Sequence, residues 1–350
     1  MRRKSSRWIV TLGLSVLVAM GLAACSDDKD EKAESTDTTT AVKGSPTIDI
    51  TMADYSYTVS GPMTAGGTMK ISNKGQEFHM MGVGKFKSGK TLADLQTALQ
   101  NAGPPGGGGE GEETTTSAAR ATTTSAAGPS TTSAQGREGE EGEEGGDPTA
   151  EVLDELGLPG NFMGPGQSAD LTVPSLGAGT YALVCFIPTE GEGMPHFAKG
   201  MLNQFEIVEG TVPAPTSSAT YKVAPGKAIE GPATLTPGRH TLKFEAASGS
   251  ENLEPGLAKL DPGTTWEQVD EAFIKIFGEG ESDEDAPPPP KGAASQVPAK
   301  IVFGAFDLEA ITTYYLATDF SAGDYIINAA DTDVDDRPKP DKEVINIKVG

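Results

Sequence analysis

The two halves of the chain carry the same sequence signals in the same order. A Gly-Pro pair at 61–62 precedes a strand-like run and a helix start at 91–94. In the second half, a Gly-Pro pair at 231–232 precedes a strand-like run and a helix start at 265–268. Each helix start has Thr followed three residues later by an acid or an amide, as in a capping box. An Ala-Gly-x-Tyr strand start and an alternating closing strand complete each half, so the repeat predicts two similar units in tandem.

Short alternating apolar runs separated by Gly and Pro indicate that both units are all-β. We predict two Greek-key β-sandwich domains, about 46–210 and 217–350, each with a short helical insertion on one connection. Two low-complexity tracts, 101–149 and 278–295, interrupt the domains and have almost no large apolar residues. Such tracts cannot bury enough apolar surface to fold, so both are predicted to be disordered.

The first residues predict export and a lipid anchor. Residues 1–24 combine a basic start with an apolar stretch that is too short for a membrane span, as in a signal peptide. They end in Leu-Ala-Ala before Cys25, which resembles a bacterial lipobox whose Cys becomes the lipidated first residue of the mature chain. The alternative is an ordinary secretory signal followed by a chance Cys. We therefore expect an extracytoplasmic protein, anchored to the bacterial cell membrane through Cys25, with residues 25–45 as a flexible stalk.

Charge and cysteine content narrow the classes of partner. The precursor has a net charge of -23, and removing residues 1–24 takes away four basic and no acidic residues, which gives -27. So acidic a chain is not expected to bind nucleic acid through its phosphates, but it can attract a basic partner. The chain has two Cys, so lipidation of Cys25 leaves Cys185 as a free thiol without an intramolecular disulfide.

Four side chains form a candidate metal-binding set. Cys185, His196 and Met201 lie within 17 residues of one another, and His79 lies upstream. Two imidazoles, one thiolate and one thioether are the donors of a blue-copper site, in which the thioether is a weak axial ligand. The other interpretation of the thiol is a small buried hydrophobe, because Tyr181, Leu183 and Cys185 share one face of a predicted strand.

The motifs around these four residues resemble those of the cupredoxins of the plastocyanin and azurin type. An Asn-x-Gly sequence at 73–75 precedes the first His, and a Tyr-x-x-x-Cys strand at 181–185 leads to Pro-His, Gly-Met and a last strand. Residues 54–57 and 65–73 also look like the first two strands of bacterial cupredoxin-like domains. The resemblance implies a cupredoxin-like fold for both domains. It also implies that His79, Cys185, His196 and Met201 bind copper.

The spacing between Cys185 and His196 departs from that family, in which only a few residues separate the two ligands. Ten residues intervene here. Pro188, Gly191 and Gly193 predict an inserted turn that brings His196 back beside Cys185. The acidic residues of this turn, at 190 and 192, are expected to be solvated.

The second half lacks the candidate ligands. The position equivalent to Cys185, four residues after the strand Tyr, is Ala329, and no Met occurs in this half. Its one His, His240, lies in a strand that matches 68–73, well before the position of His79. We therefore predict one metal site, in the first domain.

Three functions are compatible with the sequence. The first is electron transfer through one copper ion, with a redox protein as partner. The second is capture or delivery of copper, helped by thioethers at Met80, Met81 and Met194, which suit Cu(I). The third is a metal-free module for binding or scaffolding in the cell envelope. Zinc ranks below copper because of the Met position, and no hydrolase motif is present, so enzymatic activity is not expected.

Overall fold

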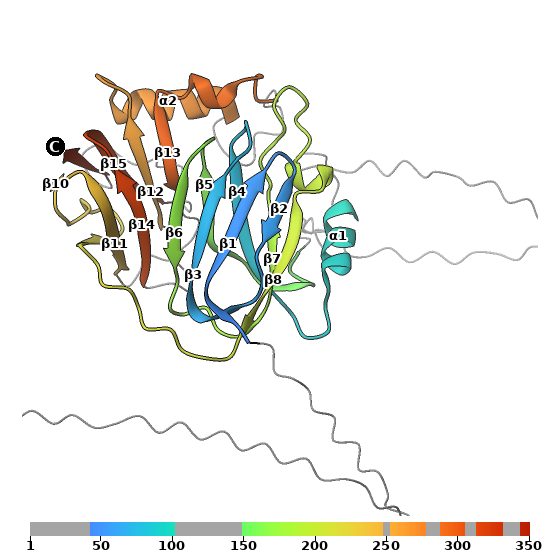
Figure 1. Cartoon of the computed structure of the whole chain (residues 1–350). Coiled ribbons are helices and arrows are strands. Elements are labelled where there is room, and N and C mark those ends of the chain that lie inside the picture. Colours follow the sequence, from blue (N-terminus) through green and yellow to red (C-terminus); the bar gives the residue numbers. More distant parts are fainter. Residues whose placement is uncertain (1–42, 102–148, 248–252, 278–287, 305–312, 332–343) are drawn as a thin grey trace, which may run out of the picture. The chain divides into compact units, whose positions relative to one another are not determined.

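The computed structural model describes residues 43–101, 149–247, 253–277, 288–304, 313–331 and 344–350. Strands dominate this part of the chain (Figure 1). The strands of the first half are β1 (Ser45–Ala53), β2 (Ser56–Val59), β3 (Met63–Asn73), β4 (His79–Phe86), β5 (Leu153–Met163), β6 (Ser168–Thr172), β7 (Gly179–Val184) and β8 (Leu202–Val208). Those of the second half are β9 (Ala219–Val223), β10 (Thr234–Leu235), β11 (Gly238–Ala246), β12 (Leu253–Leu260), β13 (Ala299–Gly304), β14 (Thr313–Phe320), β15 (Gly323–Asp331) and β16 (Val344–Val349).

The described helices are few and short. They are α1 (Leu92–Asn101), α2 (Trp266–Phe277) and the 3-10 turns η1 (His196–Lys199) and η2 (Ala293–Gln296). Both predicted helix starts are present: the Thr91 amide donates to Asp94 Oδ2 at 2.8 Å, and the Thr265 amide donates to Gln268 Oε1 at 3.0 Å. Within the described residues, no helix has the length and apolar character needed to cross a membrane.

The strands follow the period-two pattern of the sequence. In β1, the side chains of Ile48, Ile50 and Met52 are buried, whereas Asp49 between them is exposed. Successive side chains of a strand point to opposite faces of the sheet, so one face of β1 is apolar. Burying each such side chain contributes roughly 1.5–3 kcal/mol, which fixes the register because a slip of one residue would expose all three.

The two halves share most of their strand pairings within the described residues. In the first half, β3 pairs with β1 and β6, β4 pairs with β5 and β7, and β7 pairs with β8. In the second half, β11 pairs with β9 and β14, β12 pairs with β13 and β15, and β15 pairs with β16. The all-β sandwich fold is confirmed, but the hairpin of β1 and β2 has no counterpart strand pair among the described residues of the second half, and the tandem pair of domains stays a prediction. The boundaries 46–210 and 217–350 stay a prediction.

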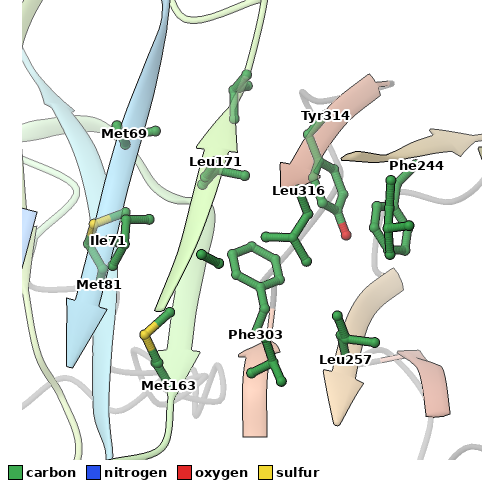
Figure 2. Close-up of a cluster of buried hydrophobic side chains, with 14 of the residues drawn as sticks. Met69, Ile71, Met81, Met163, Leu171, Phe244, Leu257, Phe303, Tyr314 and Leu316 are labelled. Atoms are coloured by element: carbon green, nitrogen blue, oxygen red, sulfur yellow. The ribbon is translucent and has the colours of Figure 1, made fainter. Parts of the chain in front are cut away.

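The sheets of the two halves are joined edge to edge. Antiparallel pairing links β6 to β14, with Leu171 opposite Leu316, and links β5 to β13, with Phe162 opposite Gly304. The described residues belong to one compact unit. Figure 2 shows the apolar core that both halves share, with these labelled side chains: Met69, Ile71, Met81, Met163, Leu171, Phe244, Leu257, Phe303, Tyr314 and Leu316.

Three predicted segments fall wholly or mainly outside the described residues: the signal segment 1–24, the stalk 25–45 and the tract 101–149. The second tract, 278–295, is described from Pro288 onward, and there the structure differs from the expected disorder. Pro289 and Ala293 are buried, and η2 begins at Ala293. Composition alone missed this order, because it arises from contacts with a distant segment of the first half.

Candidate metal centre

Three elements bring the candidate donors to one end of the first sandwich. His79 is the first residue of β4, Cys185 follows the last residue of β7, and His196 is the first residue of η1. Because β4 and β7 are antiparallel neighbours, with Gly82 opposite Val184, the start of β4 lies at the end of β7. The side chains of all three donors are completely buried.

The donor atoms of these residues converge. His79 Nδ1 lies 3.1 Å from His196 Nδ1, and Cys185 Sγ lies 3.4 Å from His196 Nδ1. One ligand atom from each residue lies within 4.8 Å of the other two, and this is the one such group of three among the described residues. Sequence positions 79, 185 and 196 therefore meet around one point.

The insertion between Cys185 and His196 folds as a closed turn. A bridge joins Pro188 to Pro195, and both the amide and the hydroxyl of Thr189 donate to the Met194 carbonyl, at 2.8 and 2.7 Å. At the base of the turn, the His196 amide donates to the Ile187 carbonyl at 2.9 Å. The predicted return of His196 to the side of Cys185 is confirmed.

Met201 lies beside the other candidate ligands along the main chain. Its amide donates to the His196 carbonyl at 3.0 Å, and its carbonyl accepts from the Cys185 amide at 3.3 Å. Its side chain is completely buried in the same apolar cluster as Cys185. Its role as an axial ligand stays a prediction.

Each imidazole is held from behind by a carboxylate. His79 Nε2 lies 3.3 Å from Asp54 Oδ1, and His196 Nε2 lies 3.1 Å from Glu77 Oε2. A carboxylate bonded to the outer ring nitrogen fixes the ring and directs the lone pair of the other nitrogen inward. In the tautomers with both Nε2–H groups donating outward, two Nδ1 lone pairs would face each other across 3.1 Å. A metal cation bound by both nitrogens would satisfy these lone pairs.

Burial keeps both imidazoles neutral near pH 7. It lowers the pKa of His79 to about 4, with the neighbouring His196 acting in the same direction. Burial also lowers the pKa of His196, although its bond to Glu77 opposes the shift. Neutral imidazole is the form that binds metals.

Burial also favours the neutral form of Cys185, but for a thiol this is not the form that binds a metal. Burial raises the pKa of Cys185 to about 12, although hydrogen bonds from the Met80 and Ile187 amides oppose the shift. The Met80 amide donates to Sγ at 3.4 Å. A metal that binds Sγ must therefore displace a proton, and the amide then stabilises the thiolate.

The Asn-x-Gly sequence before His79 has a structural explanation. Buried Asn73 donates to the carbonyls of Glu77 and Met163 and accepts from the Gly75 amide, each at 2.9 Å. A Cβ on Gly75 would lie 2.3 Å from Asp54 Oδ1 and 2.4 Å from His79 Nε2. Only glycine leaves room there for the pair of His79 and its carboxylate.

Three residues of the site were missed by the sequence interpretation. Asp54 and Glu77 hold the imidazoles, and the Tyr55 ring lies edge-on to His196 with ring centroids 5.1 Å apart. The Tyr55 hydroxyl donates to Glu77 Oε1 at 2.9 Å. The only available signal was their proximity in sequence to the cupredoxin-like motifs, since sequence does not show which way a turn carboxylate points.

The second half has no such cluster among its described residues. In the β-ladders, Lys85 of β4 lies opposite Tyr181 of β7, and Lys259 of β12 lies opposite Tyr325 of β15. Counting from these equivalent pairs, Leu253 corresponds to His79 and Ala329 corresponds to Cys185. His240 lies elsewhere, with Nε2 2.8 Å from the Thr236 carbonyl and Nδ1 3.1 Å from Ser218 Oγ.

No family model matches the chain, and no curated protein sequence matches it. Among solved structures, it is similar to dithionite-reduced auracyanin from Roseiflexus castenholzii, with 18% identity, a TM-score of 0.25, and coverage of 47% of this chain and 99% of auracyanin. It is also similar to a multicopper oxidase, with 10% identity, a TM-score of 0.21, and coverage of 87% of this chain and 88% of the oxidase. A copper-containing nitrite reductase from Thermus scotoductus has 10% identity, a TM-score of 0.19, and 87% and 61% coverage. Likeness at these TM-scores does not by itself assign a function.

These comparisons correct one expectation from the sequence. The chain was expected not to be an enzyme because no hydrolase motif is present, yet the similar structures include an oxidase and a nitrite reductase. Missing hydrolase motifs say nothing about copper oxidoreductases, whose chemistry depends on metal ligands and not on those motifs.

The donor set fits copper. Two inward-facing imidazole nitrogens and one thiol sulfur, buried together, are able to hold a copper ion. The carboxylates behind the rings and the amide on Sγ supply the outer contacts that such a site needs.

Proposed function

We propose that the protein is a copper-binding electron-transfer lipoprotein, extracytoplasmic and anchored to the cell membrane through Cys25. His79, Cys185 and His196 would hold one copper ion, with Met201 as a weak axial ligand. The observation that carries this proposal is the convergence of His79 Nδ1, His196 Nδ1 and Cys185 Sγ in a fully buried site.

The residues around the donors suit electron transfer. Bound copper would supply a one-electron couple whose potential depends on its ligands and on the hydrogen bonding around the Cys sulfur. Asp54 and Glu77 hold the rings in one orientation, so the ligands need not rearrange between oxidation states. Burial excludes water, and half-buried Tyr55 separates His196 from solvent.

The decisive experiment uses soluble protein that starts after Cys25. Addition of Cu(II) is expected to give an intense visible thiolate-to-copper band that is absent in Cys185→Ser. Because Cu(I) is colourless, bound copper is measured on the same samples. A colourless protein without stoichiometric copper contradicts the proposal and favours the metal-free envelope module.

Copper capture or delivery is the second candidate. Met194 lies in the turn between Cys185 and His196. Its side chain is 47% exposed, and among the described residues it is the exposed large hydrophobic side chain. An exposed thioether beside a copper site suits the arrival or departure of Cu(I). Copper delivery predicts that Met194→Leu slows loading from a Cu(I) donor and leaves the redox potential of the loaded protein unchanged, whereas pure electron transfer predicts no change in either.

The anchor is tested separately. Expression of the full chain in a bacterial host is expected to place it in the membrane fraction, and Cys25→Ser is expected to release it. Equal partitioning of both proteins would contradict lipidation and leave the copper proposal untouched.

A further inference from the structure

The turn between Cys185 and His196 is attached to the second half of the chain. The Gly191 amide donates to the Pro289 carbonyl at 2.6 Å, and the Gly292 amide donates to Glu190 Oε2. Pro289 and Ala293, on the second-half side of this contact, are buried. The sequence placed Glu190 in solvent. The structure instead half-buries it, in contact with a segment about a hundred residues away.

Glu190 is also bonded to the carboxylate that holds His196. Its amide donates to Glu77 Oε2 at 3.0 Å, and the same oxygen lies 3.1 Å from His196 Nε2. One residue therefore links the second half, through its side chain, to the support of a candidate ligand, through its main chain.

A second contact reaches the residue before His79. The Phe78 ring stacks on Phe162, with centroids 5.0 Å apart, and packs against Phe273 and Phe277 of α2 at 5.7 and 6.0 Å. The second half thus contacts Phe78, the residue before His79, and the turn that leads to His196. Aromatic pairs of this kind contribute beyond their buried area and have preferred geometries, so they restrict how the start of β4 can move.

The contact at Glu190 includes an energetic cost. Glu190 Oε1 is buried without a hydrogen-bond partner among the described residues. A buried oxygen that loses water without gaining a donor is unfavourable. The carboxylate is held in this position through its other oxygen, Oε2, which accepts from the Gly292 amide.

We propose that Glu190 is a positioning residue: by bonding the Gly292 amide it fixes the long turn, and through Glu77 it fixes the His196 ring that faces Cys185. The second half, which has no candidate ligands among its described residues, then acts as the support of the metal centre in the first. The consequence for copper rests on the proposed function; the attachment of the turn does not.

Four proteins test the proposal. Glu190→Ala removes the acceptor for the Gly292 amide, and Glu190→Gln removes the charge but keeps an acceptor. Comparing these two variants separates the hydrogen bond from the change in charge. Glu192→Ala is the matched control, because Glu192 lies in the same turn but is exposed and is paired with Lys199 at 2.5 Å. The wild type completes the set.

The first readout is amide hydrogen exchange of residues 187–196 in copper-free protein. Loss of a hydrogen bond to a charged group is expected to speed local exchange in Glu190→Ala by about tenfold. Glu190→Gln and Glu192→Ala should stay close to wild type. Equal exchange in Glu190→Ala and Glu192→Ala would overturn the proposal, whether or not the wild type binds copper.

The second readout is the copper centre. Glu190→Ala is expected to keep one copper per chain but to show a broadened electron paramagnetic resonance spectrum and a shifted redox potential relative to Glu190→Gln. Identical spectra and potentials in the two variants would overturn the positioning of His196. Absence of copper from the wild type would refute the proposed function, and the exchange experiment would still decide the attachment of the turn.

Discussion

The two halves of the molecule share most of their strand pairings and differ in the residues at corresponding positions. In both, a Lys side chain lies over the Tyr that is the third residue of a strand: Lys85 Nζ is 6.0 Å from the Tyr181 ring centroid in β7, and Lys259 Nζ is 5.6 Å from that of Tyr325 in β15. Four residues after that Tyr, the first half has Cys185 and the second has Ala329, and both side chains are fully buried. In either half, a small side chain fills this buried position of the strand. The thiol of Cys185 is therefore not needed to fill this buried position.

The largest expected effect comes from giving the first half the residue of the second. Cys185→Ala should reduce bound copper from about one per chain to none, because the thiolate is the strongest donor of the set. Metal analysis after dialysis measures this. Ala329→Cys is the reciprocal control and should gain no copper, because Leu253 stands where the first half has His79. Stoichiometric copper in Cys185→Ala would contradict the assigned site.

The shared core tests whether the halves are energetically separate. Phe303, from β13, is 1% exposed and packs near Tyr314 in the core common to both halves. Phe303→Ala should lower the free energy of unfolding by about 3–5 kcal/mol, and Phe303→Leu should lower it by less. Denaturant unfolding, followed by a probe in each half, should show one transition. Two transitions would support independently folding tandem domains if Phe303→Ala shifts only the transition reported by the probe in the second half.

The carboxylates behind the imidazoles are expected to have graded effects. Glu77 is 14% exposed and bonds His196 at 3.1 Å, whereas Asp54 is 39% exposed and lies 3.3 Å from His79. Glu77→Gln should weaken copper binding by about 10–100-fold, and Asp54→Asn should weaken it less. Competition with a chelator of known affinity measures both. A larger loss in Asp54→Asn would mean that His79, not His196, limits the site.

The smallest expected effect is a gain in the free energy of unfolding. Tyr314 Oη is buried without a hydrogen-bond partner among the described residues, and its ring stacks on Phe244 with centroids 4.7 Å apart. Tyr314→Phe keeps the stacking and removes the unpaired hydroxyl, so it should raise the free energy of unfolding by about 1–2 kcal/mol. Copper affinity should not change. A loss of stability would indicate that the hydroxyl has a partner, such as a buried water.

Several features of the structure were predictable because they depend on local sequence. The alternation in β1, the Thr-x-x-Asp start of α1 and the repeat of strand signals gave the sandwich and its helices. The glycines and prolines between Cys185 and His196 gave a turn. Counting four residues from Tyr325 also identified Ala329 as the residue of the second half that corresponds to Cys185. These signals involve residues close in sequence, where propensity and periodicity apply.

Other features depend on which distant segments meet, and no local signal encodes that. Asp54 and Glu77 point at the imidazoles, and the segment from Pro288 is ordered by the turn of the first half, although its composition predicts disorder. The joining of the sheets through β5–β13 and β6–β14 likewise appears only in three dimensions.

The sequence by itself therefore determined the residue types of the site, their order and the strand-forming halves that carry them. Only the tertiary structure decided that His79, Cys185 and His196 meet within 4.8 Å, that a carboxylate contacts each ring, and that the second half contacts the turn between Cys185 and His196. The physical reason is that ligand identity is a property of single residues. Convergence and orientation instead depend on long-range packing, in which the free energy of burying apolar surface selects one arrangement of the chain.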